Sequence, residues 1–332
     1  MSSNQMIVLA SRPVGTAGPE NFRLTETPMP EPKPGEVLVR HLYLSLDPYM
    51  RGRMNASRSY AAAQNLDEVM IGGTVGQVIA SHNPRFKTGD HVVGMGGWQQ
   101  FAVSDGRDLH KVDGGLVPLS AYLGPVGMPG VTAWYGLNKI IAPKPGETVL
   151  VSAATGAVGS VVGQLAQLAG AKAVGIAGGP DKCAYAVKEL GFEACIDHRA
   201  PDFADAFKKA LPKGIDGVFE NVGGQPLDLA LRRLNPFARL AICGMVASGY
   251  DGTPTPFSDI SNILTMRAMM QGFIVSEHID IWPQALAELA GHVAAGRIKY
   301  RESVVEGLAQ APAAFFGLLR GENFGKMLVK LS

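Results

Sequence analysis

The chain of 332 residues has few cysteines, almost no net charge and no clustered histidines, and each shortage excludes a class of protein. The three cysteines, Cys183, Cys195 and Cys243, are widely spaced and form no C-x-x-C pair. They provide no disulfide framework and agree with a reducing compartment. A formal net charge of +1 without a basic run argues against nucleic acid and anionic membranes as partners. The N-terminus lacks the pattern of a secretion signal, so we expect a cytoplasmic protein.

A long uncharged stretch, 148–171, is the one candidate for a membrane span by length. Its four glycines, glutamines and hydroxyl side chains make it only modestly apolar, and we expect a buried strand followed by a buried helix. With 46% apolar and 18% charged residues, the chain can bury a large core. Its length favours two domains, and its 41 glycines and 22 prolines favour many tight turns.

The first 125 or so residues read as short strands separated by turns, which is typical of a partly closed barrel. We expect strands at 37–46 and 72–79, and another near 91–94 that pairs with 99–103.

From about Gly127 apolar strands alternate with helical stretches, which predicts a parallel sheet with helices on both faces. The expected strands are 148–152, 173–177, 194–196, 217–220, 239–243 and 272–275. The expected helices are 131–141, 157–169, 181–190, 203–211, 226–234, 256–270 and 282–295. After about Arg297 the chain becomes barrel-like again and ends in a strand at 326–331. We therefore predict a doubly wound domain, 127–296, inserted into a barrel domain of 1–126 and 297–332.

The most informative motif lies between the expected strand at 148–152 and the helix that follows. It reads Ala154-Thr155-Gly156-Ala157-Val158-Gly159, an approximate G-x-G-x-x-G fingerprint with alanine in the first glycine position. Small residues let a pyrophosphate approach the backbone, and free N–H groups at the helix start favour the phosphate. The strand–turn–helix context therefore predicts a dinucleotide site.

The end of the next strand predicts which dinucleotide binds. An acidic residue there would hold the ribose 2′-hydroxyl of NAD and repel a 2′-phosphate. This strand instead runs into Gly178 and Gly179, with Lys182 one turn into the following helix. Asp181 is free to act as a helix cap. The pattern predicts NADP(H), with Lys182 supplying the positive charge.

Seven stretches, taken together and in order, resemble the zinc-independent branch of the medium-chain dehydrogenase/reductase superfamily. Within it they are most similar to the prostaglandin reductases (leukotriene hydroxydehydrogenases), plant alkenal double-bond reductases and bacterial curcumin-type reductases. The stretches are 46–52, 127–137, 153–164, 219–224, 242–244, 271–275 and 323–327.

This resemblance implies a GroES-like barrel domain and a Rossmann domain, NADPH as hydride donor, an α,β-unsaturated aldehyde or ketone as acceptor, and a homodimer. In the family a lysine matching Lys182 and a later tyrosine hold the 2′-phosphate, and here His198, with Arg199 beside it, takes the tyrosine's place. The further cofactor residues that the resemblance implies are Asn221, Cys243, Gly244, Phe273, Ile274, Val275 and Asn323.

Metal ligands are missing from this pattern. The stretch 72–76, where a zinc enzyme of this superfamily would carry a ligand, has no His-Glu pair, and no four-cysteine lobe exists. The seven histidines have no ligand spacing. We therefore expect no metal, and charge on the substrate stabilised by hydrogen bonds alone.

Two tyrosines are candidates for the proton donor. Tyr250 lies in the loop after the last core strand, where the resemblance implies a tyrosine near the nicotinamide, although an extra residue precedes it here. Tyr49 is the second candidate, and water is a third source. We place Asp47, Tyr49, Met50 and Arg51 in the substrate pocket. We expect Arg51, Arg53 and Arg58 to be charges of an exposed loop.

Three functions fit the sequence. The leading hypothesis is reduction of the carbon–carbon double bond of enals and enones with NADPH. A quinone reductase would use the same cofactor without zinc, and a third possibility is a protein that binds NADPH without turnover.

Overall fold

The computed structural model describes residues 3–57, 59–248, 257 and 259–331 and divides the chain into two compact units. The first unit joins Met1–Leu123 to Glu302–Ser332, and the second is Gly124–Arg301. The second unit is thus inserted into the first. The chain passes between them at 123/124 and 301/302, where we expected 126/127 and 296/297.

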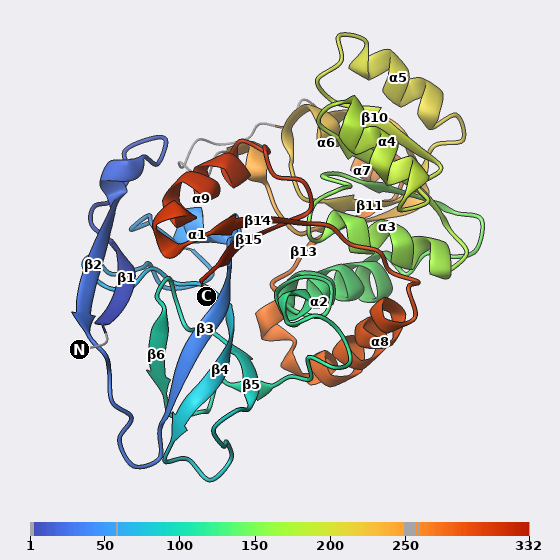
Figure 1. Cartoon of the computed structure of the whole chain (residues 1–332). Helices are drawn as coiled ribbons and strands as arrows, with labels where there is room; N and C mark the ends of the chain where they lie inside the picture. The colour runs from blue at the N-terminus through green and yellow to red at the C-terminus, as the bar shows by residue number, and fades with distance from the viewer. Residues whose placement is uncertain (1–2, 58, 249–256, 258, 332) are drawn as a thin grey trace. The chain divides into compact units, whose positions relative to one another are not determined.

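The second unit contains a parallel sheet of six strands (Figure 1). Its strands are β8 (Thr148–Val151), β9 (Lys172–Ala177), β10 (Ala194–Asp197), β11 (Ile215–Glu220), β12 (Leu234–Ile242) and β13 (Met269–Gly272). Their order across the sheet is β10-β9-β8-β11-β12-β13. Starting from β8, successive strands are added on one side up to β10 and on the other side from β11 onward. This is the order of doubly wound dinucleotide-binding sheets, so the predicted Rossmann fold is confirmed.

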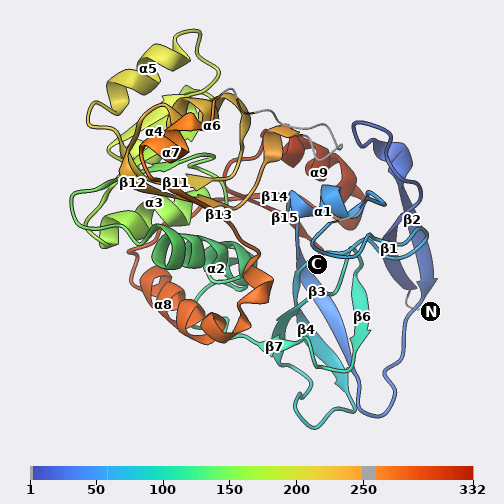
Figure 2. The same ribbon diagram turned by 180° about the vertical axis from the view of Figure 1, so that it is seen from behind.

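Helices cover both faces of this sheet because its strands are apolar on both sides (Figures 1 and 2). Val149 and Val151 pack on one face and Leu150, between them, on the other, as the alternation of a strand requires. The first face is covered by α2 (Met128–Tyr135), α3 (Gly159–Leu168), α4 (Pro180–Lys188) and α8 (Trp282–Ala294). The second is covered by α5 (Phe203–Ala210), α6 (Gly224–Leu231) and α7 (Ser261–Thr265).

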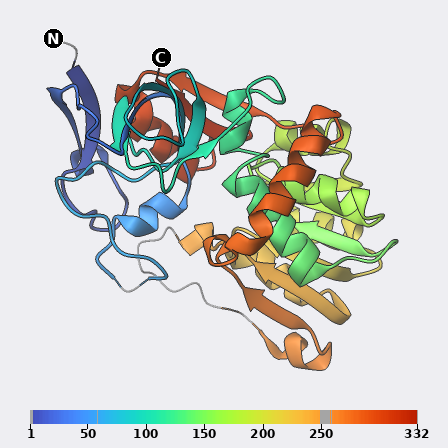
Figure 3. The ribbon, with the colours of Figure 1, turned by 90° about the horizontal axis from the view of Figure 1, so that it is seen from below.

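The first unit is built from strands that curve around an apolar core and pair antiparallel, apart from one parallel pair in its closing segment (Figure 3). The main sheet has the order β14-β15-β3-β4-β5-β7, with β6 paired to β3, and β1 and β2 form a separate hairpin. The bounds are β1 (Ser3–Leu9), β2 (Phe22–Pro28), β3 (Val37–Ser45), β4 (Thr74–Ser81), β5 (His91–Gly94), β6 (Phe101–Ser104), β7 (His110–Lys111), β14 (Glu302–Glu306) and β15 (Lys326–Lys330). Two helices, α1 (Tyr49–Arg53) and α9 (Ala311–Leu319), complete it.

Three expectations about elements are wrong. The strand β6 pairs with β3 rather than with β5, because both edges of β5 are taken by β4 and β7. The helix expected up to residue 270 ends at Thr265, since Arg267 adopts a left-handed φ of 50° and Met269 then pairs with Arg239 of β12. The same pairing places the last strand at Met269–Gly272 instead of 272–275. The helix α9 was not expected in the closing segment.

Within the described residues, no helix has the length and apolarity that crossing a membrane requires.

Candidate functional site

The turn after β8 folds back so closely on its own backbone that its glycine positions have little room for a side chain. Ala153 adopts a φ of 50°, and its carbonyl oxygen accepts the N–H of Gly156 at 2.9 Å. An added Cβ on Gly159, the first residue of α3, would lie only 2.3 Å from that same oxygen. On Gly156 it would lie 3.2 Å away. The turn that holds Ala157 and Val158 thus requires a glycine at 159, while Gly156 has slightly more room.

The alanine in the first position of the motif is accommodated by the neighbouring strand. Ala154 is fully buried, and its Cβ occupies the space above Gly175 of β9, where an added Cβ would lie 2.6 Å from it. A second close approach lies in α3, where a Cβ on Gly163 would lie 2.0 Å from the ring of Phe192. The departure from the fingerprint at Ala154 is therefore matched by a glycine on β9.

A buried carboxylate fixes the neighbouring strand ends. The Oε1 atom of Glu220, at the end of β11, accepts hydrogen bonds from the hydroxyl of Ser152 at 2.7 Å and from the N–H groups of Val222 and Gly223. The Ser152 hydroxyl in turn accepts the N–H of Asn221 at 2.7 Å, and the Asn221 amide donates to the Ser152 carbonyl at 2.8 Å. Burial raises the pKa of Glu220, while these donors oppose the rise. The network ties the end of β8 to the β11–α6 turn.

The end of β12 is attached to the same strand. The N–H groups of Cys243 and Gly244 both donate to the carbonyl oxygen of Glu220, at 2.8 and 3.1 Å. Burial, and secondarily the charge of Glu220, raises the pKa of Cys243 to about 12, so this thiol stays protonated at neutral pH. Asn221, Cys243 and Gly244 are therefore held at the carboxyl ends of β11 and β12, as predicted for this edge.

The segment after β13 is anchored by aromatic packing. The ring of Phe273 is buried against Tyr135 and Phe219, with centroids 5.4 and 6.2 Å apart. Ile274 precedes a short 3₁₀ turn, Val275–Glu277, and the carbonyl of Val275 accepts the indole N–H of Trp282. The predicted residues 273–275 thus follow a sheet strand, although they do not form one.

At the ends of β9 and β10 a carboxylate is occupied by backbone donors. Asp197 accepts the N–H of Gly179 at 2.7 Å and the N–H of Arg199 at 2.9 Å. These bonds hold the pKa of Asp197 below its usual value despite its burial. Gly179, with a φ of 99°, is the N-cap of α4. The expectation that Asp181 caps this helix is wrong, since Asp181 lies in the first turn with an exposed side chain.

Three basic side chains gather beside this turn. An added Cβ on Gly178 would lie 2.9 Å from Nε2 of His198 and 3.0 Å from Nε of Arg199, so both side chains lie over this glycine. Burial and then the charge of Arg199 lower the pKa values of Lys182 and His198. Basic side chains are thus close together at this turn, which is the arrangement of an anion-binding site.

In the first unit, the stretch predicted to line the substrate pocket is anchored by a buried ion pair. The Nζ atom of Lys326 donates to Oδ1 of Asp47 at 3.0 Å and to the carbonyl of Leu46 at 2.7 Å. The Ser45 hydroxyl also donates to Asp47. Burial first, and the charge of Asp47 second, raises the pKa of Tyr49, which begins α1.

The side chains that follow Tyr49 are buried, contrary to our expectation of an exposed basic loop. Met50 and Arg51 are 0% and 1% exposed. The guanidinium of Arg51 donates to the carbonyl of Gly15 and to Oδ1 of Asn55, and Arg53 donates to the carbonyl of Ala62. These guanidinium groups tie the backbone at Gly15 and Ala62 to the segment 51–53. Arg58 lies outside the described residues.

The last two predicted site residues are Asn323 and Tyr250. The amide of Asn323 donates to the carbonyl of Gly325 at 2.7 Å, just before β15. Tyr250 lies outside the described residues. The structure thus brings the predicted cofactor residues of the second unit to one edge of its sheet, and Asp47, Tyr49, Met50, Arg51 and Asn323 belong to the first unit.

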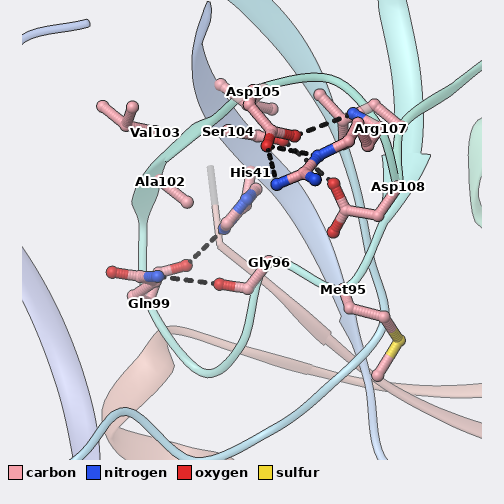
Figure 4. Close-up of a pocket in the computed structure, with 12 residues that line it drawn as sticks. His41, Met95, Gly96, Gln99, Ala102, Val103, Ser104, Asp105, Arg107 and Asp108 are labelled. Carbon is pink, nitrogen blue, oxygen red and sulfur yellow. Dashed lines mark hydrogen bonds and ion pairs between the residues drawn. The ribbon is translucent and has the colours of Figure 1, made fainter. Parts of the chain in front are cut away.

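The first unit also holds a cavity of about 460 Å³ between β3, β6 and the loop before β7 (Figure 4). None of the predicted site residues that the structure describes lines it. His41 borders it, donating from Nδ1 to the carbonyl of Gln99 at 2.8 Å, and burial lowers its pKa to about 4. Figure 4 shows Arg107 paired with Asp105 at the rim.

Comparison with known proteins decides the family. Residues 5–112 match the model "N-terminal domain of oxidoreductase" and residues 157–291 the model "Zinc-binding dehydrogenase". The chain is 45% identical to an NADPH-dependent curcumin reductase of Escherichia coli, over 99% of this chain and 97% of the relative. It is 39% identical to a 2-alkenal reductase (NADP(+)-dependent) of Nicotiana tabacum, over 90% and 88%. The crystal structure of CurA in complex with NADPH from Vibrio vulnificus superposes with a TM-score of 0.94 at 47% identity, covering 99% of each chain.

The chain belongs to the zinc-independent medium-chain dehydrogenase/reductases. Over the part of the chain that is described, no three or more His, Cys, Asp and Glu side chains are grouped so as to hold a metal ion. The GroES-like and Rossmann domains expected of this family are both present.

The sequence analysis missed Ser152 and Glu220, whose hydrogen bonds hold the strand ends at this edge of the sheet. Glu220 carried a usable signal, because it is a charged residue that directly follows the apolar, buried Val218 and Phe219. A carboxylate in that position requires partners, and here they are the backbone of the adjoining turn.

Proposed function

We propose that this protein reduces the carbon–carbon double bond of α,β-unsaturated aldehydes and ketones, using NADPH as hydride donor. The observation that carries the proposal is the group of Lys182, His198 and Arg199 at the end of β9. In sheets of this order the adenosine ribose lies at that strand end. The relatives named above include a curcumin reductase that is NADPH-dependent and a 2-alkenal reductase.

The residues of the second unit fit NADPH better than NADH. Lys182 and Arg199 supply positive charge, and His198 supplies a further donor for a 2′-phosphate. The nearby carboxylate of Asp197 accepts two backbone N–H groups, which offset its charge toward an incoming phosphate. NADH carries a neutral hydroxyl at this position, and a neutral hydroxyl gains far less from positive charge than a phosphate does.

The remaining cofactor contacts follow from the sheet edge. The diphosphate would lie over Ala154–Gly159, where glycines leave the backbone open and α3 begins. Residues for the nicotinamide end are those predicted above, namely Asn221, Cys243, Gly244, Phe273, Ile274, Val275 and Asn323. The network of Ser152 and Glu220 would hold this end in one shape.

Bound in this way, NADPH would supply a hydride to the β-carbon of the substrate. The enolate that results needs a hydrogen-bond donor at its oxygen and a proton at its α-carbon. Tyr49, whose raised pKa keeps it protonated at neutral pH, is suited to donating a hydrogen bond. Tyr250, Tyr49 and water are the proposed proton sources, and Asp47, Tyr49, Met50 and Arg51 are the proposed pocket stretch.

An isotope experiment tests this function directly. The protein is given NADPH deuterated at the reactive C4 position, with an enal, an enone and a small quinone as separate substrates. We expect the saturated carbonyl product with deuterium at the β-carbon, read by mass spectrometry and NMR. Turnover of the quinone alone would replace this proposal with a quinone reductase. Saturable NADPH binding without any product would replace it with a binding protein.

Assembly as a homodimer and location in the cytoplasm stay predictions. Sedimentation of the purified protein across a tenfold range of concentration would test the first.

A further inference from the structure

A buried lysine at the start of β15 has an acceptor for each of its three ammonium protons. The Nζ atom of Lys326 donates to the carbonyl oxygen of Leu46 at 2.7 Å, to Oδ1 of Asp47 at 3.0 Å and to the carbonyl oxygen of Met327 at 3.2 Å. The Lys326 side chain is 3% exposed and that of Asp47 is 9% exposed. Because a buried charge is tolerated only when it is paired and hydrogen-bonded, these two groups depend on each other.

The segment that carries Asp47 is fixed at side chain and backbone alike. Oδ1 of its carboxylate accepts Lys326, and Oδ2 accepts the hydroxyl of Ser45. The N–H of Leu46 donates to the carbonyl oxygen of Met327 on β15 at 3.2 Å. A rotation of the carboxylate or a shift of the segment would therefore break at least one of these bonds.

A stiff connection leads from Asp47 to Tyr49. Pro48 lies between them with a φ of −58° and a ψ of −31°, and its ring locks φ. It is the N-cap of α1, which begins at Tyr49. The first turn of α1 closes on Asp47, whose carbonyl oxygen accepts the N–H of Met50 at 3.1 Å. The placement of Asp47 thus sets the direction in which the Tyr49 side chain leaves the backbone.

We propose that Lys326 is a positioning residue, which holds Tyr49 in place through Asp47. This inference rests on the proposed function, in which the Tyr49 hydroxyl donates a hydrogen bond to the enolate oxygen. Without the ammonium, the buried carboxylate of Asp47 would take up a proton or move toward solvent. Either change alters the segment that carries Tyr49, and a reacting group displaced by about 1 Å loses roughly 100-fold in rate.

A second carboxylate faces the same lysine from the neighbouring strand. Glu302 of β14 is the register partner of Lys326. Burial raises the pKa of Glu302, and a hydrogen bond from Ser120 and then the charge of Lys326 oppose the rise. The printed bonds of Lys326 run to the Asp47 side, so we assign its positioning role to that side. Glu302→Gln is therefore a control for the other neighbour of this lysine.

A comparison of single and double variants tests this path by turnover of an enone. We expect Tyr49→Phe to lower kcat roughly 100-fold and Lys326→Met roughly 30-fold, with the dissociation constant of NADPH changed less than about twofold. If Lys326 acts through Tyr49, the double variant should be no slower than Tyr49→Phe alone. Losses that multiply to about 3,000-fold would make Lys326 a structural residue only and overturn the inference.

Two further variants protect this comparison. Lys330→Met, a partly exposed lysine of the same strand that pairs with Glu306, should leave kcat unchanged. If Lys326→Met does not fold, the neutral pair Lys326→Met with Asp47→Asn takes its place, because no buried charge is then left alone. The same criterion applies to it, namely that adding Tyr49→Phe causes no further loss.

A spectroscopic measurement decides the inference without turnover. With ¹³Cζ label in all eight tyrosines, the NMR signal of Tyr49 is the one that Tyr49→Phe removes. We expect this signal to move in Lys326→Met and to stay in place in Lys330→Met and Glu302→Gln. A signal that does not move in Lys326→Met would overturn the inference.

The two measurements separate this inference from the proposed function. If the signal moves and no enone is reduced, the proposed function fails and Lys326 still positions Tyr49. If enones are reduced and the signal does not move, only the positioning role fails. If enones are reduced and Tyr49→Phe leaves kcat unchanged, Tyr49 is not the donor, and the inference fails while the reduction stands.

Discussion

The turn after β8 and the strand ends of β9 and β10 lie at the same edge of one sheet, but they consist of different types of residue. The turn consists of small residues, and its shape is set by contacts of 2.3 to 3.2 Å that an added Cβ would make with a carbonyl oxygen. The strand ends carry long basic side chains around Gly178. The turn would select its ligand by the space that its backbone leaves, and the strand ends would select theirs by positive charge.

This difference determines how each region responds to substitution. At Gly159 the turn does not accept one more carbon, because the backbone itself would have to move. A group of charges accepts changes of residue type as long as donors and charge remain. His198 stands where the resemblance implies a tyrosine, and the proposed phosphate site keeps its donors.

The largest expected effect comes from filling the turn. We expect Gly159→Val to lower the free energy of unfolding by about 3 kcal/mol and to abolish NADPH binding, because its Cβ would lie 2.3 Å from the carbonyl oxygen of Ala153. Gly156→Ala is the matched control. Its Cβ would lie 3.2 Å from the same oxygen, so it should cost less than about 1 kcal/mol. Denaturant unfolding and cofactor fluorescence measure both, and equal effects of the two substitutions would contradict the steric argument.

The β8 side of the edge does not depend on small residues alone. It also depends on a charged group, the buried carboxylate of Glu220. Glu220→Ala leaves Ser152 and two backbone N–H groups without their acceptor and should cost about 3 kcal/mol of stability. Glu220→Gln keeps an oxygen that accepts the same donors, so we expect a loss of less than about 1 kcal/mol. Chemical denaturation distinguishes the two. If Gln were as damaging as Ala, the negative charge rather than the acceptor would hold the turn.

The sequence predicts the features of this edge that depend on local spacing, but not those that depend on contacts between distant segments. The alternation of strands and helices, the turn and its glycines follow from local patterns, namely apolar periodicity and small residues at fixed spacing. The alanine at 154 was visible, but its compensation by Gly175 was not, since the two meet only when β8 and β9 pair. Likewise β6 pairs with β3 through contacts of long sequence separation.

Burial was the other quantity that the sequence could not supply. Arg51 looked like an exposed charge, but it is buried because carbonyl oxygens from distant segments accept its donors. Sequence spacing carries no information about such contacts.

The charged side of the edge is tested by removing one charge. We expect Lys182→Ala to raise the KM for NADPH roughly 30-fold and the KM for NADH less than about twofold, because only NADPH carries the 2′-phosphate. Stability should be unchanged. Lys188→Ala, an exposed lysine of the same helix, should alter neither KM. Equal effects of Lys182→Ala on both cofactors would remove the basis for assigning the phosphate to this side.

The smallest expected effect is a pH dependence that only the charged region can produce. Burial and Arg199 hold the pKa of His198 below 6.5, so the imidazole is mostly neutral in the free protein at pH 7. A bound phosphate raises that pKa, and binding therefore takes up a proton. Affinity for NADPH should rise about threefold as pH falls from about 8 to 6.5, with the affinity for NADH constant. His198→Asn should abolish this difference between the cofactors. A threefold change that persists in this variant would assign the proton to another group.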